Sequence, residues 1–219
     1  MDARPLFWTD KDRRRHGYEP EAAASVAAAM GLTVRWEFRK WAEFKPTLDA
    51  HEADAIWCGC AITPAREQAF LFSRSYAIFD EAVLIRRGDP YSSPKDLTGR
   101  RVGAIAGSTN MALAEQWPGC ERVAFDGTSD DVFGEMIESL RNGHLDAVVD
   151  DEPAFGGCVE EGSFDIAFVV PTANRWGAAM RMGDRNLAAA INEGIGTVIH
   201  NGELRQIWER WFAPKPFPL

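Results

Sequence analysis

The chain has 219 residues, of which 46% are hydrophobic, so it is long enough to bury the core of one large domain or two small ones. Its formal net charge is -9, and the sequence shows no sign of the basic surface stripe that nucleic-acid binding needs. We therefore expect no nucleic-acid partner. No apolar run reaches the roughly 20 residues of a membrane span.

Helical and strand patterns alternate along the first half of the chain. The predicted elements there are a helix over 20–30, a strand over 33–38, a helix over 42–51, a strand over 54–58 and a long strand over 81–87. A strictly alternating order of this kind is typical of the α/β class.

The same rhythm restarts at Ser93. The predicted elements are a capped turn over 92–99, strands over 101–106, 122–125 and 146–150, helices over 108–117 and 129–143, and then strands over 165–170 and 176–182. Two helices, over about 185–200 and 203–212, close the chain. The repeated order predicts two lobes, with segments near 81–87 and 168–176 as a two-stranded hinge.

The start of the chain breaks this pattern. The order opens at the Pro-containing loop "ARPLFW", with no strand before it and no charged-then-apolar leader. We therefore expect that residues upstream of Met1 supply a first strand and a signal peptide.

Arg66 stands at an unexpected place in "GCAITPAREQAFLFS". Thr63 is a favoured N-cap and Pro64 is tolerated at the first helical position, so the pair predicts the start of a helix. Arg66 would then lie in the first turn, where the helix dipole mildly repels a cation. The alternatives are a solvated surface arginine or a side chain that meets an anion there.

Four cysteines, Cys58, Cys60, Cys120 and Cys158, lack zinc-site spacing, and we expect no metal and no cofactor. Cys58 and Cys60 alternate along a predicted strand and would share a face, which disfavours a bond between them. Two alternatives stay open for the set: small buried thiols, or a Cys120–Cys158 bridge in an exported protein.

Five segments in order resemble the type II periplasmic solute-binding proteins of the polar amino-acid family, the ligand receptors of ABC importers. They are "GYEPEAAASVAAAMGL", "GCAITPAREQAFLFSRSY", "SSPKDLTGRRVGAIAGST", "LRNGHLDAVVDDEP" and "NGELRQIWERWF". The resemblance covers nearly the whole length. It implies one α/β lobe from residues 1–86 plus 173–219 and a second from 87–172, each a mixed sheet flanked by helices.

The resemblance also implies a role for Arg66. In the family, the arginine of the T-P-x-R motif binds the α-carboxylate of the ligand, and a guanidinium suits this because its fork donates two parallel bonds. The carbonyl at Gly59 and a hydroxyl at the position of Ala61 meet the α-ammonium. Ala61 has no hydroxyl, so this chain departs from the family there, and only its backbone N–H remains, which can reach the carboxylate.

The second half of the ligand site is implied on the other lobe. Ser108 and Thr109 match family contact positions, although such residues are also ordinary helix caps. Asp151 matches the carboxylate that meets the α-ammonium; the other interpretation, a helix N-cap, is disfavoured because Pro153 would make Glu152 the cap. Asp150 is either a polar contact to the ligand or a solvent-facing side chain.

Two tryptophans match aromatic walls in the family. Trp41 falls at the position of an aromatic that stacks on the ligand, and Trp8 lies near the loop that supplies the other wall. Core packing is the alternative for both. Selection among ligand side chains would fall to Trp8, Trp41, Cys60, Ile105 and Asp150.

The resemblance implies a non-enzymatic receptor for a free amino acid or close analogue. Its partners would be this small ligand and the membrane permease of an ABC transporter, and we expect a monomer in the periplasm or another extracytoplasmic space. The alternative is an enzyme on the same fold, resembling cyclohexadienyl dehydratases that act on arogenate or prephenate. In that case Asp150 or Glu152 would be the acid.

Overall fold

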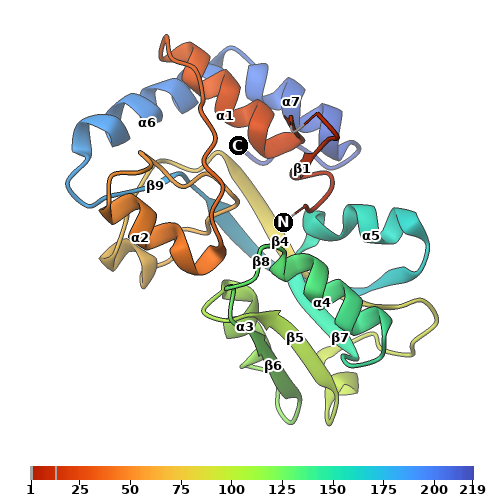
Figure 1. Ribbon diagram of the computed structural model, residues 1–219. Helices are drawn as coiled ribbons and strands as arrows, with labels where there is room; N and C mark the ends of the chain where they lie inside the picture. The colour runs from red at the N-terminus through yellow and green to blue at the C-terminus, as the bar shows by residue number, and fades with distance from the viewer. Residues whose placement is uncertain (1, 13) are drawn as a thin grey trace. The chain divides into compact units, whose positions relative to one another are not determined.

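The computed structural model describes residues 2–12 and 14–219. Their contacts divide the chain into two compact units. Unit 1 comprises residues 1–4, 40–42 and 79–173, and unit 2 comprises 5–39, 43–78 and 174–219. Mixed α/β structure in both units confirms the predicted fold class (Figure 1).

Unit 1 is built on a five-stranded sheet with the order β6-β5-β7-β4-β8. Its strands are β4 (Ala77–Arg86), β5 (Arg101–Ile105), β6 (Glu121–Phe125), β7 (Ala147–Asp151) and β8 (Phe164–Trp176). β5 runs parallel to β6 and β7, whereas β4 runs antiparallel to β7. Residue 79 divides β4 between the units, and residue 174 divides β8, so both strands connect them.

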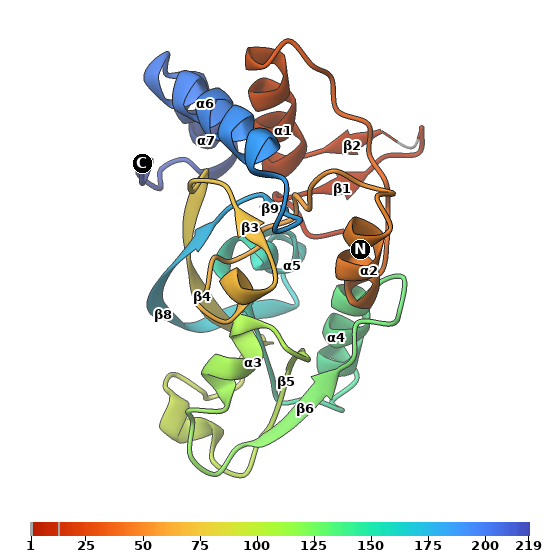
Figure 2. The same cartoon turned by 90° about the vertical axis from the view of Figure 1, so that its left-hand side faces the viewer.

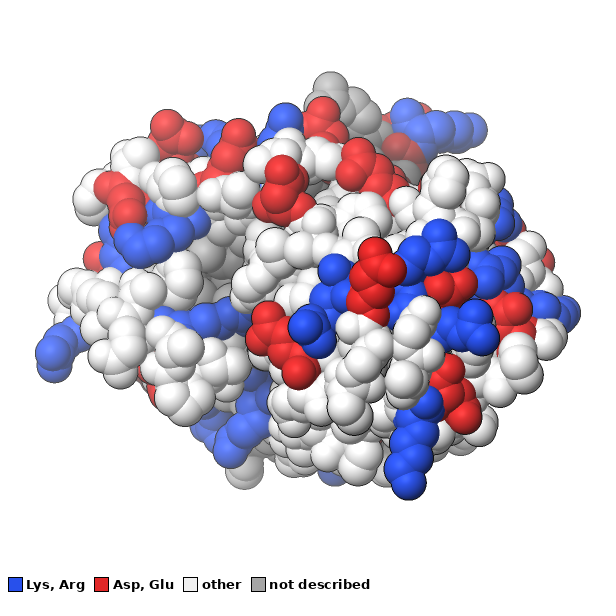
Figure 3. Space-filling view, turned by 90° about the horizontal axis from the view of Figure 1, so that it is seen from below, with Lys and Arg blue, Asp and Glu red and all other residues white. Residues whose placement is uncertain are grey.

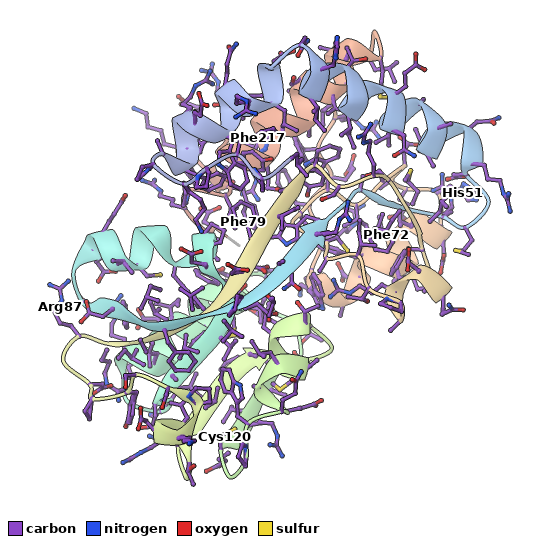
Figure 4. The ribbon with its side chains drawn as sticks, turned by 180° about the vertical axis from the view of Figure 1, so that it is seen from behind. His51, Phe72, Phe79, Arg87, Cys120 and Phe217 are labelled. Atoms are coloured by element: carbon purple, nitrogen blue, oxygen red, sulfur yellow. The ribbon has the colours of Figure 1, made fainter. Side chains whose placement is uncertain are left out.

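Short helices follow the sheet strands of unit 1. They are η3 (Pro94–Leu97), α3 (Thr109–Ala114), α4 (Val132–Arg141), η4 (Glu152–Phe155) and α5 (Gly156–Glu161). A buried apolar cluster that includes Val83, Leu97, Val102, Trp117 and Val149 forms the core. Cys120 belongs to this cluster and lies in unit 1 (Figure 4).

Three helices pack together in unit 2: α1 (Tyr18–Ala29), α6 (Arg185–His200) and α7 (Glu203–Phe212). Trp208 of α7 is fully buried and makes edge contacts with the rings of Tyr18 and Phe217. Figure 4 labels Phe217. The remaining elements are η1 (Trp41–Glu43), α2 (Phe44–Asp49), η2 (Arg66–Gln68) and the strand pairs β1 (Trp8–Thr9)–β2 (Arg15–His16) and β3 (Leu71–Phe72)–β9 (Ala179–Met180).

Several predicted elements are confirmed by the structure. The two closing helices have the predicted bounds, and the strands predicted near 101–106, 122–125 and 146–150 appear as β5, β6 and β7. The strands predicted over 165–170 and 176–182 are wrong in their division, because β8 continues through Pro171. Since β8 is an edge strand of its sheet, the missing N–H of Pro171 breaks no internal ladder.

Two predicted strands of unit 2 are also wrong. Residues 33–38 form neither helix nor strand, and residues 54–58 are reduced to a single bridge between Ile56 and Ala179. Alternating apolar residues favour a strand, but a strand forms only where a neighbour accepts its backbone hydrogen bonds. Among the described residues, nothing pairs with 33–38 in this way.

Charges of both signs are mixed on the face that Figure 3 draws. Figure 3 shows Lys and Arg side chains interleaved with Asp and Glu over the face that it draws. Within the described ranges, no helix is both long enough and apolar enough to cross a membrane.

Candidate functional site

The loop that begins at Gly59 is fixed by a backbone that only glycine adopts easily. Gly59 has φ +68°, and a Cβ there would lie 3.1 Å from the ring of Trp176. Its N–H donates to Glu19 Oε2 at 3.0 Å. Residues 59–61 are therefore held against the core of unit 2 by both packing and a buried hydrogen bond.

Arg66 is positioned by its own turn. Its N–H donates to Thr63 Oγ1 at 3.2 Å, although the N-cap residue of the turn that forms is Ala65 and not the predicted Thr63. The predicted helix is wrong, however, because only the three-residue 3-10 helix η2 forms. A single turn has little dipole, so the expected repulsion of Arg66 loses most of its physical basis.

The guanidinium of Arg66 is half-buried and lies beside the loop. Its Nη1 donates to the carbonyl oxygen of Ala61 at 3.1 Å and lies 3.9 Å from Cys60 Sγ. Burial raises the pKa of the Cys60 thiol, although the charge of Arg66 opposes this shift. Cys60 is therefore a neutral, buried thiol beside the arginine.

Ala61 and the cysteines contribute packing to this region. Ala61 is buried and forms an isolated antiparallel bridge with Trp176. All four cysteines are free, so the Cys120–Cys158 bridge does not form and the buried-thiol alternative fits Cys60 and Cys120. Cys58 and Cys60 pack with one apolar cluster of unit 2, but on a loop instead of the expected strand.

Trp8 packs within unit 2. Its ring stacks on His16 with the centroids 5.7 Å apart and meets the edge of Trp211 at 5.4 Å. These contacts favour the packing alternative for Trp8, because its ring already stacks on one protein ring and meets a second.

In unit 1, Ser108 caps α3. Its Oγ accepts from the N–H of Met111 at 3.0 Å and donates to the carbonyl of Ile105 at 2.6 Å. Its own N–H donates to the same carbonyl. Ser108 is therefore committed to the cap and holds Thr109, the first residue of α3, in place.

Asp150 and Asp151 end β7. Asp150 is 8% exposed, so the interpretation of a solvent-facing side chain is wrong. Its Oδ1 accepts from the N–H of Asp151 at 2.8 Å. Burial raises the pKa of Asp150 to about 7; the charge of Glu81 adds to the shift and the hydrogen bond from Asp151 opposes it.

Asp151, and not Glu152, occupies the N-cap position of η4, which corrects the prediction. Pro153 stands one residue later than a first helical position because the 3-10 helix begins at Glu152. The Asp151 carboxylate nevertheless makes no capping hydrogen bond.

Trp41 clusters with unit 1, although it was expected in the lobe that contains residues 1–86. Its indole lies against Gly127, where a Cβ would approach Trp41 Cδ1 to 2.8 Å. The N–H of Ala42 donates to the carbonyl of Gly127 at 3.2 Å. Gly127, with φ +71°, therefore provides a flat surface for the ring.

A sequence profile of the bacterial extracellular solute-binding proteins, family 3, matches residues 1–214. The chain belongs to this family.

Relatives of this solute-binding protein span nearly its whole length. A "Probable histidine-binding protein" of Neisseria gonorrhoeae is 26% identical over 214 residues, which cover 95% of this chain and 79% of the relative. The "L-cystine-binding protein TcyJ" of Escherichia coli (strain K12) is also 26% identical, with the same shares covered. The solved structure of an ancestral arginine-binding protein bound to arginine has a TM-score of 0.87 and 25% identity, covering 96% of this chain and 94% of that one. This likeness confirms the two-lobed fold class.

Three buried polar residues of the solute-binding protein escaped the sequence analysis. Glu19 lies at the start of α1, Glu81 on β4, and Asn110 on α3 donates to Glu81 Oε1 at 3.2 Å. Glu81 lies within the strand sequence "AIFDEAVLIR", and an acid inside an otherwise largely apolar internal strand was the available signal. Glu19 gave no such signal, because an acid in the first helical turn is ordinary.

A surface pocket of unit 2 is separate from the predicted site residues of the solute-binding protein. It has a volume of about 370 Å³, and its lining includes Phe70, Phe72, Arg74 and Arg175 (Figure 4 labels Phe72). Its lining contains neither Arg66 nor Gly59. The pocket is therefore distinct from the predicted contacts at Gly59 and Arg66.

Proposed function

We propose that this protein is the substrate-binding component of an ABC importer and binds a free amino acid or a close analogue. The relatives named above bind histidine, cystine and arginine according to their names, and these ligands share only the α-carboxylate and α-ammonium groups. Recognition of the shared groups is therefore the part of the site that we assign. Its partner would be a membrane permease, and its location extracytoplasmic.

Arg66 binds the α-carboxylate in this proposal. The observation that carries it is the anchoring of one guanidinium nitrogen, Nη1, on the carbonyl of Ala61, which fixes the plane of the fork beside the Gly59 loop. A fixed planar fork donates two parallel hydrogen bonds to a carboxylate at low entropic cost. The neutral thiol of Cys60 adds no competing negative charge.

Asp151 binds the α-ammonium. It stands at the end of a β-strand, at the position where the family resemblance places the acid that meets the α-ammonium. Gly59 contributes its carbonyl to the ammonium. The backbone N–H of Ala61 donates to the carboxylate instead, and the hydroxyl contact of relatives is absent. Ser108 would act by placing Thr109, and Trp41 would present an aromatic face to the ligand.

The charge of the ligand side chain belongs to the same proposal. Asp150 and Glu81 are both buried in unit 1, and the charge of Glu81 raises the pKa of Asp150. Two buried carboxyls whose charges interact destabilise each other's ionised forms, and a positively charged group nearby would relieve the repulsion. We therefore propose that the protein binds a basic or polar amino acid more tightly than an acidic one.

The dehydratase alternative has weaker support. Asp150 has a pKa suited to a general acid near neutral pH, which is the one observation in its favour. The relatives, however, are named as binding proteins. Unchanged recovery of a bound amino acid supports a receptor, and turnover of arogenate or prephenate that is lost in Asp150→Asn or Glu152→Gln supports the enzyme.

Replacing Arg66 tests the proposal directly. Arg66→Ala should weaken amino-acid binding at least tenfold, because loss of a charge-assisted hydrogen bond costs about 1.5–3 kcal/mol. Isothermal titration calorimetry with arginine, histidine and cystine measures this. Arg185→Ala, which removes an exposed arginine of α6, is the matched control and should bind like the wild type. Equal affinity of Arg66→Ala and the wild type would refute the carboxylate assignment.

A further inference from the structure

A buried carboxyl group lies directly behind the Gly59 loop, residues 59–61. Glu19 Oε2 accepts a hydrogen bond from the N–H of Gly59 at 3.0 Å and another from Tyr76 Oη at 2.8 Å. The N–H of Gly59 also lies 3.3 Å from Tyr76 Oη. Glu19 and Tyr76 are both buried, so no bulk water replaces these hydrogen bonds if the loop moves. The two side chains therefore fix the N–H of Gly59.

Glu19 and Tyr76 are themselves held by rigid parts of unit 2. Glu19 lies in the first turn of α1, which packs beside α6 and α7 (Figure 2). The Tyr76 ring stacks on Trp57 with the centroids 4.3 Å apart, and the Tyr76 carbonyl accepts from Tyr18 Oη at 2.7 Å. The pair is therefore a fixed point against which the loop is positioned.

Packing alone does not explain an acid at position 19. A buried carboxyl group loses its hydration, and hydrogen bonds must compensate for the lost free energy. An acid in the first helical turn usually interacts with the positive end of its own helix. The hydrogen bonds of Glu19 Oε2 instead come from residues 40 and 57 positions later in the chain. The segment that gains order from this carboxyl is the Gly59 loop.

The fixed N–H helps to determine where the carbonyl of Gly59 points. Gly59 has φ +68°, and the ring of Trp176 lies against the position that a side chain would occupy. On the other side, the carbonyl of Cys60 accepts from the N–H of Gly177 at 3.0 Å. Peptide groups are planar, so holding the group before and the group after this carbonyl leaves it one direction.

We propose that Glu19 and Tyr76 are positioning residues for amino-acid binding, which orient the carbonyl of Gly59 toward the α-ammonium of the ligand. The inference rests on the proposed function, which assigns this contact to Gly59. An ionised carboxylate holds the N–H of Gly59 more strongly than a neutral acid does, and its negative charge favours a cation nearby. Both effects make ionised Glu19 the form that binds the ligand more tightly.

The protonation of Glu19 then makes affinity depend on pH. Burial raises the pKa of Glu19 to about 7, although the hydrogen bonds from Tyr76 and Gly59 oppose the shift. Burial also raises the pKa of each phenol and thiol that interacts with this carboxyl, so these groups are neutral near neutral pH: Tyr18, Tyr76, Cys58 and Cys60. The arginines whose charge acts on Cys58 stay charged throughout: Arg15 and Arg66. Amino-acid affinity should therefore rise as pH rises through about 7.

Isothermal titration calorimetry of the full chain, from about pH 5.5 to about pH 8, tests this inference. The ligand is whichever of arginine, histidine and cystine the wild type binds most tightly. Glu19→Gln keeps the shape and an acceptor oxygen but does not titrate. The ratio of wild-type to Glu19→Gln affinity should grow from about one to between about three and ten, because a charge-assisted hydrogen bond is roughly twice as strong as a neutral one. Titration of the ligand itself cancels in this ratio.

Tyr76→Phe supplies a second, independent readout. It removes a donor to Glu19 but keeps the ring that stacks on Trp57. Because the hydrogen bond from Tyr76 lowers the pKa of Glu19, its loss should move the rise in affinity to higher pH. A side chain with a packing role alone would not move it. This variant also carries the test if circular dichroism shows that Glu19→Gln does not fold.

Glu193→Gln, at an exposed acid of α6, is the matched control and should keep the wild-type pH profile. If the wild type binds an amino acid but its ratio to Glu19→Gln does not change with pH, the inference is wrong and the proposed function stands. A rise in affinity at the same pH in Tyr76→Phe and the wild type also overturns the inference. A wild type that binds none of the three amino acids overturns the proposed function, and this inference with it.

Discussion

Glu19 is a buried carboxyl group whose surroundings make the stability of the fold depend on pH. Its carboxylate is 1% exposed, and Oε2 accepts from Tyr76 Oη at 2.8 Å and from the N–H of Gly59. Burial raises its pKa from the ordinary 4.5 to about 7, although both hydrogen bonds oppose the shift. At pH values between 4.5 and about 7, Glu19 is therefore protonated in the folded protein and ionised in the unfolded chain.

The sign of the pH dependence follows from this shift. Between pH 4.5 and about 7 the folded state binds more protons at Glu19 than the unfolded state does, so stability falls as pH rises. Glu19→Gln should remove the part of this fall in the free energy of unfolding that Glu19 causes, on the order of 1–3 kcal/mol between pH 4.5 and about 7. Urea unfolding of both proteins at several pH values measures the difference.

A second variant checks that the effect belongs to the residue. The pKa of Asp150 is also raised, from 3.8 to about 7. Asp150→Asn should therefore remove a separate part of the loss of stability that accompanies rising pH. The two variants should act additively, because Glu19 is in unit 2 and Asp150 in unit 1. A difference between wild type and Glu19→Gln that does not change with pH would contradict the assignment.

At the scale of the element, the short helix α3 depends on its cap. Ser108→Ala removes the acceptor for the Met111 N–H and should lower the free energy of unfolding by about 1 kcal/mol. Because the hydroxyl is already engaged twice, amino-acid affinity should change less than threefold. Chemical denaturation and calorimetry on the same samples measure the two effects.

The exposed Ser163→Ala is the matched control for this change. It removes a hydroxyl that donates to Glu161 on the surface, so stability should stay within about 0.5 kcal/mol of the wild type. A large loss of affinity in Ser108→Ala with unchanged stability would instead make Ser108 a ligand contact.

Elements with local signals were predicted well. The helices α6 and α7 were found with correct bounds because Asn201-Gly202 separates two amphipathic patterns. Residues 33–38 show the opposite case, since their alternation is strand-like but pairing depends on a distant neighbour. The expected helix at Arg66 failed for a related reason: the hydrogen bond to Thr63 is present, but "AFLF" soon leads into β3.

The site was predictable only in part, and for a physical reason. Motif resemblance marked Arg66 and Asp151, whose assignments stay predictions. It could not indicate that the Ser108 hydroxyl is hydrogen-bonded within the cap of α3, or that Asp150 is buried and interacts with the charge of Glu81. Burial and hydrogen-bond partners arise from residues far apart in the chain, and no single segment specifies them.

For the whole molecule, the proposed ligand contacts come from residues of both units. Arg66 belongs to unit 2 and Asp151 to unit 1. A ligand that requires both residues binds only when both units are folded, so its binding free energy raises the melting temperature of the whole chain. At a ligand concentration of 100 Kd this stabilisation is about 2.7 kcal/mol.

Asp151→Asn should reduce this ligand-induced stabilisation selectively. The amide keeps the shape but loses the charge that faces the α-ammonium, so the melting temperature should rise much less with an amino acid. The smaller shift given by the matching deaminated carboxylic acid should hardly change, because Arg66 alone holds it. Asp130→Asn, at a highly exposed carboxylate of unit 1, should respond like the wild type to both ligands. Differential scanning calorimetry makes the comparison. If Asp151→Asn is stabilised by the amino acid as much as the wild type is, the ammonium is bound elsewhere, and the buried pair Glu81 and Asp150 becomes the next place to look.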